Sequence, residues 1–199
     1  ADVEAENKTY TVVFVLPVLL APVDLSYAFT PSQQSVVNQI TINATPQQVW
    51  AQIITFPPIQ PDERKWSVSH TILGAPVPIG SHMDGDVRHA QWTMGVTYEE
   101  RLTQIVEGRH MAWDIHFADD FDMDGIDDHI QPNSRQLFLE RGQYDLTYDG
   151  QNTTLTLRTD YRLQTFWNGY VSQWGQLFLG DNHNAILHVI KQRAEAAHG

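Results

Sequence analysis

The sequence predicts an α+β domain in which antiparallel strands form a sheet and a long C-terminal helix packs across it. Two segments with alternating apolar residues, 135–148 and 153–163, are joined by Asp149-Gly150, a dipeptide typical of β-hairpin turns. They lead into residues 167–197, which have the apolar period of a helix about 45 Å long. A sheet that ends in such a helix encloses a groove, and we expect the functional site there.

The C-terminal helix follows from the spacing of its large apolar residues. From Trp167 to Ile190 they recur at i, i+3 and i+4, which places them on one face of a helix. Gly180 lies within this stretch and weakens a helix by up to about 1 kcal/mol relative to alanine. We expect one helix, either continuous or bent near residues 180–182.

The first helix has a clear start signal. Residues 35–44 alternate as a strand, and Thr45 then stands where a residue can cap the helix. Pro46 fits the first helical position, and Gln48 completes a capping box. Three prolines between residues 57 and 61 end this helix. Further strands are expected at residues 81–89, 95–105 and 110–117.

Length and composition favour a single domain. The chain has 199 residues, of which 42% are hydrophobic, and no interdomain linker divides it. We assign residues 35–199 to the domain and residues 1–34 to an extended N-terminal segment docked on it. The apolar run 10–23 is shorter than the roughly 20 residues that span a membrane. A chain cut from behind a membrane anchor would begin in the same way, so a membrane-anchored parent chain stays open.

Charge and cysteine content exclude several function classes. The formal net charge is −12, and such a surface repels nucleic acid. The chain has no cysteine, which excludes disulfides, thiol nucleophiles and cysteine-bound metals. The absence of cysteine fits either side of a bacterial inner membrane, cytoplasmic or periplasmic. We also find no His-Glu-x-x-His zinc motif and no Gly-x-Ser-x-Gly nucleophile elbow.

Several motifs resemble those of the START-like superfamily, also called the polyketide cyclase and dehydrase-like or helix-grip fold. The motifs lie at residues 40–50, 98–103, 108–113, 161–163 and 186–195. The tail, with Trp167-Asn168-Gly169-Tyr170, is most similar to a domain that follows membrane segments in some bacterial proteins of unassigned role. The resemblance implies a curved antiparallel sheet gripping the long helix around a mostly apolar cavity. In various members that cavity holds lipids, sterols, polyketides or plant hormones.

An acidic insertion at residues 119–128 departs from this resemblance. Asp120, Asp122 and Asp124 followed by Gly125 match the start of a calcium loop, because carboxylates two residues apart converge on one hard cation. The twelfth position is Gln131 rather than the glutamate of an EF-hand. Asp127 or Asp128 could instead complete the calcium shell. The alternative interpretation is a solvated acidic loop between two strands.

The expected cavity is lined by residues that share strand or helix faces. Residues that alternate along each strand share one face of the sheet, which forms one wall of the cavity, and the C-terminal helix forms the opposite wall. The candidate ligand-binding residues are Tyr98, Glu100, Leu102, Met111, Trp113, Ile115, Tyr161, Tyr170, Trp174, Leu177 and Phe178. Each of them could equally be an ordinary core residue, because large aromatic side chains are core residues first.

Glu100 is the best candidate for a buried acid. It shares parity with Tyr98 and Leu102, and we expect a partner in Arg158 or Arg162. A carboxyl group in an apolar pocket has its pKa displaced toward catalytic use, but a structural ion pair is the alternative. His116 alternates with Ile115 and is expected to face solvent.

Three functions are compatible with the sequence. The first is binding of a hydrophobic or amphipathic small molecule without catalysis, for which no cofactor is needed. The second is a cyclase or dehydratase acting on an apolar carbonyl compound, with Glu100 or a tyrosine moving a proton. The third is an interaction domain with a filled core, stiffened by calcium at the aspartate loop.

Overall fold

The computed structural model describes residues 30–118, 121, 131–165 and 168–197 of the 199-residue chain. The apolar run 10–23 and the calcium-loop aspartates Asp120, Asp122, Asp124, Asp127 and Asp128 lie outside the described residues. The predictions for the N-terminal segment and for calcium therefore stay predictions.

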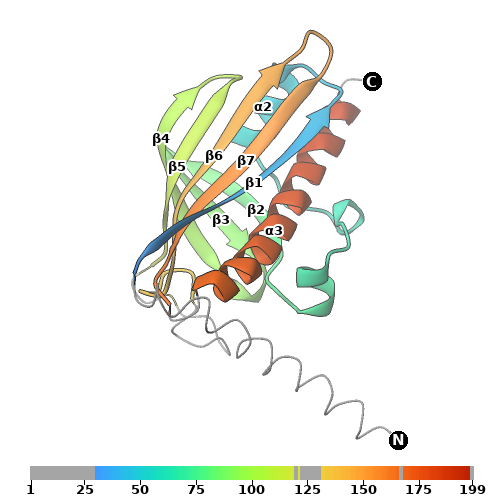
Figure 1. Ribbon diagram of the computed structural model, residues 1–199. Helices are drawn as coiled ribbons and strands as arrows, with labels where there is room; N and C mark the ends of the chain where they lie inside the picture. The colour runs from blue at the N-terminus through green and yellow to red at the C-terminus, as the bar shows by residue number, and fades with distance from the viewer. Residues whose placement is uncertain (1–29, 119–120, 122–130, 166–167, 198–199) are drawn as a thin grey trace, which may run out of the picture.

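Within the described residues, seven strands form one antiparallel sheet. The strands are β1 (Ser32–Ile42), β2 (Pro78–Asp84), β3 (Val87–Trp92), β4 (Thr97–Val106), β5 (His110–His116), β6 (Leu137–Tyr148) and β7 (Thr153–Leu163). Their order across the sheet is β1-β7-β6-β5-β4-β3-β2, so the first strand pairs with the last. Figure 1 shows that the sheet is strongly curved.

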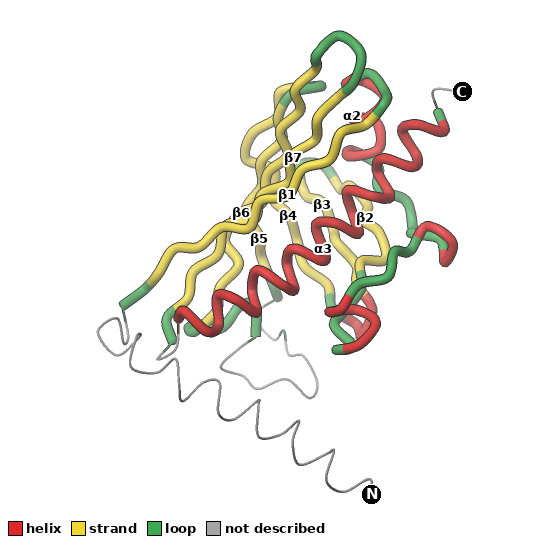
Figure 2. The backbone as a smooth tube through the Cα atoms, turned by 45° about the vertical axis from the view of Figure 1, so that its right-hand side comes forward, coloured by secondary structure: helices red, strands yellow, loops and turns green. Residues whose placement is uncertain are grey.

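In the described part of the chain, two α-helices lie on the same side of this sheet (Figure 2). They are α2 (Pro46–Ile54) and α3 (Asn168–Ala196), and α3 packs mainly along β1 and β7 and against α2. The predicted C-terminal helix is confirmed, and it continues through Gly180 without a break. No helix in the described part of the chain is long and apolar enough to cross a membrane.

The start of α2 has the predicted capping box. The Gln48 backbone N–H donates to Oγ1 of Thr45, and the Thr45 backbone N–H donates to Oε1 of Gln48 over 2.8 Å. Pro46 occupies the first turn, where its missing N–H leaves no donor unsatisfied. The helix buries Val49, Trp50 and Ile53 against the sheet.

The segment predicted as one strand at residues 81–89 is a hairpin, so that prediction was wrong. Strands β2 and β3 pair with each other around Gly85, which has a φ of 59°. Glycine adopts this left-handed conformation without steric cost, and Asp84-Gly85 is a hairpin signal in its own right. Strand β1 also begins at Ser32, three residues before the expected start.

The main core lies between the concave face of the sheet, α2 and α3. Its buried residues include Ile42 of β1, Val49 and Ile53 of α2, Leu155 of β7 and Ile190 of α3. A smaller cluster of Val36, Tyr161 and Leu163 lies under the first half of α3, where Val171 and Leu179 pack on it. The two clusters fix α3 across the sheet along its length.

Candidate functional site

The residues predicted to face inward on the strands lie on the concave face. They are buried or half-buried: Tyr98, Glu100, Leu102, Met111, Trp113, Ile115 and Tyr161. The convex face of the same strands carries exposed ion pairs, such as Arg101 with Glu99 and Arg141 with Asp114. The alternation of side chains along each strand accounts for both faces.

A buried ion pair joins β3 to β4 in the middle of the concave face. Arg88 lies opposite Glu100 in the strand register, and its Nε donates to Oε2 of Glu100. The two residues are only 4% and 7% exposed. Nη1 of Arg88 also donates to the carbonyl oxygen of Ile53 over 3.1 Å. Burial alone would lower the pKa of Arg88, but the Glu100 carboxylate beside it raises that pKa, so the guanidinium stays charged.

The prediction that Glu100 pairs with Arg158 or Arg162 was wrong. Arg158 binds Asp160 over 2.7 Å, and Arg162 binds Glu140 over 3.2 Å. Both arginines alternate with the buried residues of β7 and therefore point to the convex face. The actual partner, Arg88, was not singled out because residues 81–89 were assigned to one strand. The Asp84-Gly85 turn signal would have placed Arg88 on a neighbour of β4.

Trp113 packs into the space left by a glycine on the next strand. Gly142 lies opposite Trp113 in the register, and a Cβ atom on Gly142 would be 2.3 Å from Cε2 of Trp113. The guanidinium of Arg88 lies 4.7 Å from the centre of the Trp113 ring. Nε1 of Trp113 is buried and has no hydrogen-bond partner among the described residues. The indole therefore supports the ion pair from one side while keeping an unused donor.

Next to the ion pair lies a cavity of about 40 Å³. Its walls come from α2, β2, β3, β4, β6 and α3: Ile53, Phe56, Pro78, Gly80, Ser81, Arg88, Ala90, Trp92, Tyr98, Glu100, Tyr144 and Ile186. A volume of this size holds about two or three water molecules. Pockets for drug-sized ligands are larger, at roughly 300 Å³ or more. The site in this conformation thus accepts a small polar group and is too small for a whole lipid or sterol.

Two tyrosines complete the polar part of the cavity wall. Burial raises the pKa of both Tyr98 and Tyr144, so each phenol stays protonated and can donate a hydrogen bond. The ring of Tyr144 lies 5.2 Å from that of Trp113, which holds it in place. Tyr144 and Arg88 are site residues that sequence reasoning missed, although Tyr144 has the alternating parity of β6.

An aromatic row leads away from the cavity along the concave face. Ring centres are 6.1 Å apart between Trp92 and Tyr98, 5.2 Å between Tyr98 and Phe117, and 4.6 Å between Phe117 and Phe121. All four side chains are only partly buried. They form an apolar path that continues from the cavity wall.

Of the predicted ligand-binding residues, Tyr98 and Glu100 line this cavity. The four on α3, Tyr170, Trp174, Leu177 and Phe178, do not, and Ile186 is the α3 residue that does. Trp174 is 37% exposed and lies between the rings of Tyr170 and Phe178, at 6.2 and 5.8 Å. Their role as ligand contacts stays a prediction.

The first half of α3 approaches the sheet closely because of Gly175. A Cβ atom at this position would be 2.6 Å from the hydroxyl oxygen of Tyr161. Tyr161 is fully buried beneath the helix. Tyr161 thus packs against α3, and its predicted role as a ligand contact stays a prediction.

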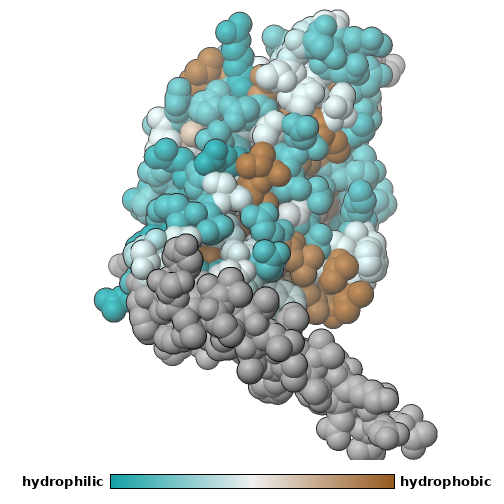
Figure 3. All heavy atoms as spheres, viewed as in Figure 1, coloured by the Kyte–Doolittle hydropathy of each residue, from teal (hydrophilic) through white to brown (hydrophobic). Residues whose placement is uncertain are grey.

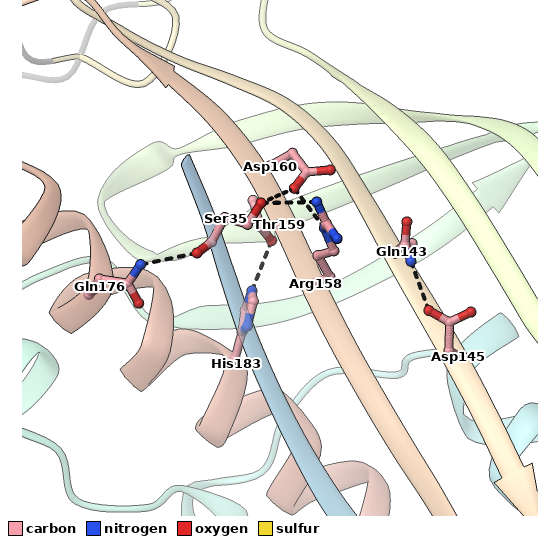
Figure 4. Close-up of polar contacts among 8 residues, drawn as sticks. All are labelled: Ser35, Gln143, Asp145, Arg158, Thr159, Asp160, Gln176 and His183. Atoms are coloured by element: carbon pink, nitrogen blue, oxygen red, sulfur yellow. Dashed lines mark hydrogen bonds and ion pairs between the residues drawn. The ribbon is translucent and has the colours of Figure 1, made fainter. Parts of the chain in front are cut away.

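Polar contacts join the middle of α3 to β1 and β7 (Figure 4). The buried ring of His183 contacts Oγ1 of Thr159 through Nε2 at 2.8 Å and Oδ1 of Asn38 through Nδ1 at 3.1 Å. Because the amide oxygen of Asn38 only accepts, Nδ1 carries the proton and Nε2 accepts from Thr159. Burial lowers the pKa of His183 to about 4, which keeps the ring neutral. Gln176 adds a hydrogen bond to the carbonyl oxygen of Ser35.

No group of three or more histidines, aspartates or glutamates in the described part of the chain is arranged to hold a metal ion. The aspartate loop at residues 119–128 falls almost wholly outside that part. Its candidate calcium ligands therefore have no described geometry.

Comparison with known proteins supports the fold. No protein-family model matches the sequence, and no curated protein matches it. The structure is similar to a norcoclaurine synthase point mutant from Thalictrum flavum in complex with a transition state analogue, with a TM-score of 0.55 and 9% identity over 85% of this chain and 99% of that one. It is also similar to the Zhui aromatase/cyclase from Streptomyces sp. R1128, with a TM-score of 0.53 and 13% identity over 84% of this chain and 97% of that one.

The helix-grip fold expected from the START-like resemblance is confirmed by these similarities and by the topology. The curved antiparallel sheet and the long C-terminal helix that were expected are both present, and they pack against each other. Identities of 9% and 13% establish the fold and leave the activity to the site itself.

Proposed function

We propose that this domain binds a small amphipathic molecule on the concave face of its sheet, without catalysis. The polar end of the ligand lies against Arg88, Glu100 and Tyr144, and its apolar part lies toward Trp92 and Tyr98. The observation that carries the proposal is the buried ion pair in the cavity wall, which has hydrogen-bonding capacity left over.

The unused capacity can be named atom by atom. Arg88 uses Nε and Nη1, and no hydrogen bond among the described residues uses its Nη2. Glu100 uses Oε2 and leaves Oε1 without a hydrogen bond to the described residues. The hydroxyl of Tyr144 makes no hydrogen bond to them either, so it is a third available group beside the cavity. The three residues line the cavity, so water or a ligand oxygen is expected to bind to these groups.

These groups favour a ligand that both accepts and donates. Nη2 and the phenol donate to a carbonyl, hydroxyl or carboxylate oxygen, while Oε1 accepts from a hydroxyl or amide. Hydrogen bonds to the charged groups of the ion pair are stronger than hydrogen bonds between neutral groups. Replacing the two or three water molecules by one ligand group would thus supply orientation and specificity.

A ligand with a large apolar part requires the wall to move, because the cavity is only about 40 Å³. The cavity walls include Phe56 and Pro78, which lie just outside the two ends of the segment 57–77. Two backbone hydrogen bonds hold the ends of that segment together. The Ile59 N–H donates to the carbonyl oxygen of Ile79 over 2.6 Å, and the Ser81 N–H donates to that of Phe56 over 2.9 Å. Breaking these two hydrogen bonds would enlarge the cavity without disturbing the sheet order.

Both structural neighbours support small-molecule binding by this fold. One is a synthase in complex with a transition state analogue, and the other is an aromatase/cyclase. A catalytic alternative therefore exists here, in which Glu100 moves a proton and protonated Tyr144 stabilises an oxygen. The ion pair with Arg88 favours the binding function, because it engages the carboxylate that would act as the base.

A cavity-filling substitution tests the proposal. Ala90 is buried in the cavity wall, and Ala90→Leu places additional carbon atoms in the space that we assign to the ligand. Titration with 1-anilinonaphthalene-8-sulfonate, an amphipathic anion, is expected to give saturable fluorescence with the wild type. We expect at least tenfold weaker binding with Ala90→Leu and unchanged binding with Ala51→Leu, at an exposed alanine of α2.

The binding function is rejected if Ala90→Leu folds stably and binds the dye as the wild type does. Organic extraction of the purified chain followed by mass spectrometry provides the independent measurement, because a co-purified apolar molecule identifies the ligand. The catalytic alternative is distinguished by Glu100→Gln, which would abolish turnover of an identified carbonyl ligand.

A further inference from the structure

We propose that the segment from Arg64 to Leu73 is a docking surface for an anionic phospholipid bilayer. This inference does not depend on the cavity being occupied. It is based on a helical turn whose apolar residues face solvent, on two cations without ion-pair partners among the described residues and on the position of the segment beside the cavity.

The turn η3 (Val68–Ile72) presents its apolar residues to solvent. Val68 is 38% exposed, Ile72 is 66% exposed and the following Leu73 is 47% exposed. Trp66, just before the turn, is 63% exposed. Figure 3 shows a hydrophobic patch over this region of a mostly hydrophilic surface.

Ser69 and His70 of the same turn face the protein, whereas Thr71 is exposed. The Ser69 backbone N–H donates to Oδ2 of Asp181 over 2.9 Å, and Nε2 of His70 lies 2.6 Å from Oδ1 of Asn182. Ser69 is fully buried. A surface helix of a globular protein normally turns its apolar side to the core, and this turn does the reverse. The turn, which is fixed to α3, and the residues on either side of it thus hold four apolar side chains outward, which is typical of an interaction surface.

Two cations precede the apolar residues. Arg64 and Lys65 are exposed and form no ion pair with the described residues. The neighbouring Glu63 is neutralised by Arg193 through contacts of 2.7 and 2.8 Å, which leaves Asp62 as the adjacent exposed acid. The exposed charges at the start of the segment, Arg64, Lys65 and Asp62, sum to +1 in a chain of net charge −12, and the Asp181 carboxylate lies on the protein side of the turn at the Ser69 N–H.

This combination fits an anionic bilayer better than a protein partner. Tryptophan prefers the boundary between lipid and water, aliphatic side chains enter the acyl region, and arginine and lysine bind lipid phosphates. The negative charge elsewhere on the chain is screened beyond about 8–10 Å at physiological salt, so the charges of the docked segment dominate. Each lysine or arginine near such a surface strengthens binding by about fivefold.

The position of the surface connects docking to the cavity. The segment lies between Phe56 and Pro78, and both of these residues line the cavity. Lipid contacts at Trp66, Ile72 and Leu73 would act on the loop whose base closes the cavity wall. Docking at this place would bring an amphipathic ligand from the bilayer close to the cavity.

Vesicle flotation with the full chain tests the proposal. We expect binding to vesicles of phosphatidylcholine with phosphatidylglycerol, weaker binding at high salt, and little binding to phosphatidylcholine alone. The double variant Arg64→Gln/Lys65→Gln is expected to lower the partition coefficient by about 25-fold. The double variant Trp66→Ser/Ile72→Ser should lower it by at least tenfold with an unchanged melting temperature, because both side chains are exposed.

Matched controls lie elsewhere on the surface. Val37 is 55% exposed on β1, and Arg109 is exposed without an ion pair among the described residues. Val37→Ser and Arg109→Gln should leave vesicle binding unchanged. The proposal is overturned if the wild type does not float with anionic vesicles, or if the Trp66 and Arg64 variants bind like the controls. It is also overturned if sedimentation shows a dimer that Trp66→Ser/Ile72→Ser converts to monomers, because the patch would then be an interface between two copies.

Discussion

The Arg88–Glu100 ion pair gives the most direct test of the site. Glu100→Gln keeps the shape of the side chain and removes its charge, so the guanidinium of Arg88 stays buried without a counter-charge. Because the two residues are 4% and 7% exposed, water cannot replace the lost carboxylate fully. Breaking a buried pair from one side costs about 3–5 kcal/mol, and we expect Glu100→Gln to lower the free energy of unfolding by this amount.

Removing both charges should cost much less. Arg88→Met alone leaves the Glu100 carboxylate buried and removes the cation–π contact with Trp113 at 4.7 Å, so we expect a loss similar to that of Glu100→Gln. The double variant Arg88→Met/Glu100→Leu leaves no buried charge. Replacements of this kind are often neutral or stabilising, and we expect the double variant to lie within about 2 kcal/mol of the wild type.

Urea unfolding at pH 7, followed by tryptophan fluorescence, measures these differences through the transition midpoint and slope. The exposed pair of Arg141 and Asp114 is the control, with side chains 53% and 42% exposed. Asp114→Asn should change stability by less than about 1 kcal/mol. If Glu100→Gln is as mild as Asp114→Asn, the pair is solvated in solution, and the reasoning about unsatisfied groups in the cavity is refuted.

Three further measurements test the packing, the pH dependence and the first helix. Gly142→Ala should destabilise the fold by about 1–3 kcal/mol in urea, because its Cβ would lie 2.3 Å from Trp113, whereas Gly180→Ala, with open space around its Cβ, should stabilise by up to about 1 kcal/mol. Burial lowers the pKa of His183 from 6.5 to about 4, so the unfolded chain binds more protons between these pH values. The stability that the neutral His183 ring contributes is fully present above pH 6.5 and should fall by about 1.4 kcal/mol per pH unit as the pH drops from 6.5 toward 4. His183→Gln should flatten this slope, measured by urea unfolding as the difference in free energy of unfolding between pH 5 and pH 7. Thr45→Ala should lower the melting temperature through a loss of about 1 kcal/mol, because it removes the cap of α2.

Local patterns in the sequence were sufficient for most of the elements. The capping box at Thr45, the hairpin at Asp149-Gly150 and the period of the C-terminal helix all depend on residues within a few positions of one another. Such signals act through backbone hydrogen bonds and dihedral preferences that neighbouring residues decide. The hairpin at Gly85 was missed although it carries the same kind of signal.

The site was predicted only in part, because its contacts join residues far apart in the chain. Parity placed Glu100 on the concave face, but its partner depended on the register between β3 and β4. The α3 residues Trp174 and Phe178 have helical spacing with the buried face, yet it is Gly175 that lies against Tyr161 of the sheet, and the neighbouring Trp174 is 37% exposed. Spacing alone cannot specify which residues of the helix meet the sheet.

The sequence by itself determined most of the strands, the helices α2 and α3 and the faces of the sheet that water avoids, since apolar period and turn chemistry are properties of short segments. Only the tertiary structure decided that Arg88 meets Glu100, that the space beside them is about 40 Å³ and that Trp66 and Ile72 face solvent. The first two features follow from strand register and from the packing of the helices against the sheet, and the third follows from the hydrogen bonds that fix η3 on α3. Strand register and helix packing are set by packing of the whole core, in which every distant contact must be satisfied at once.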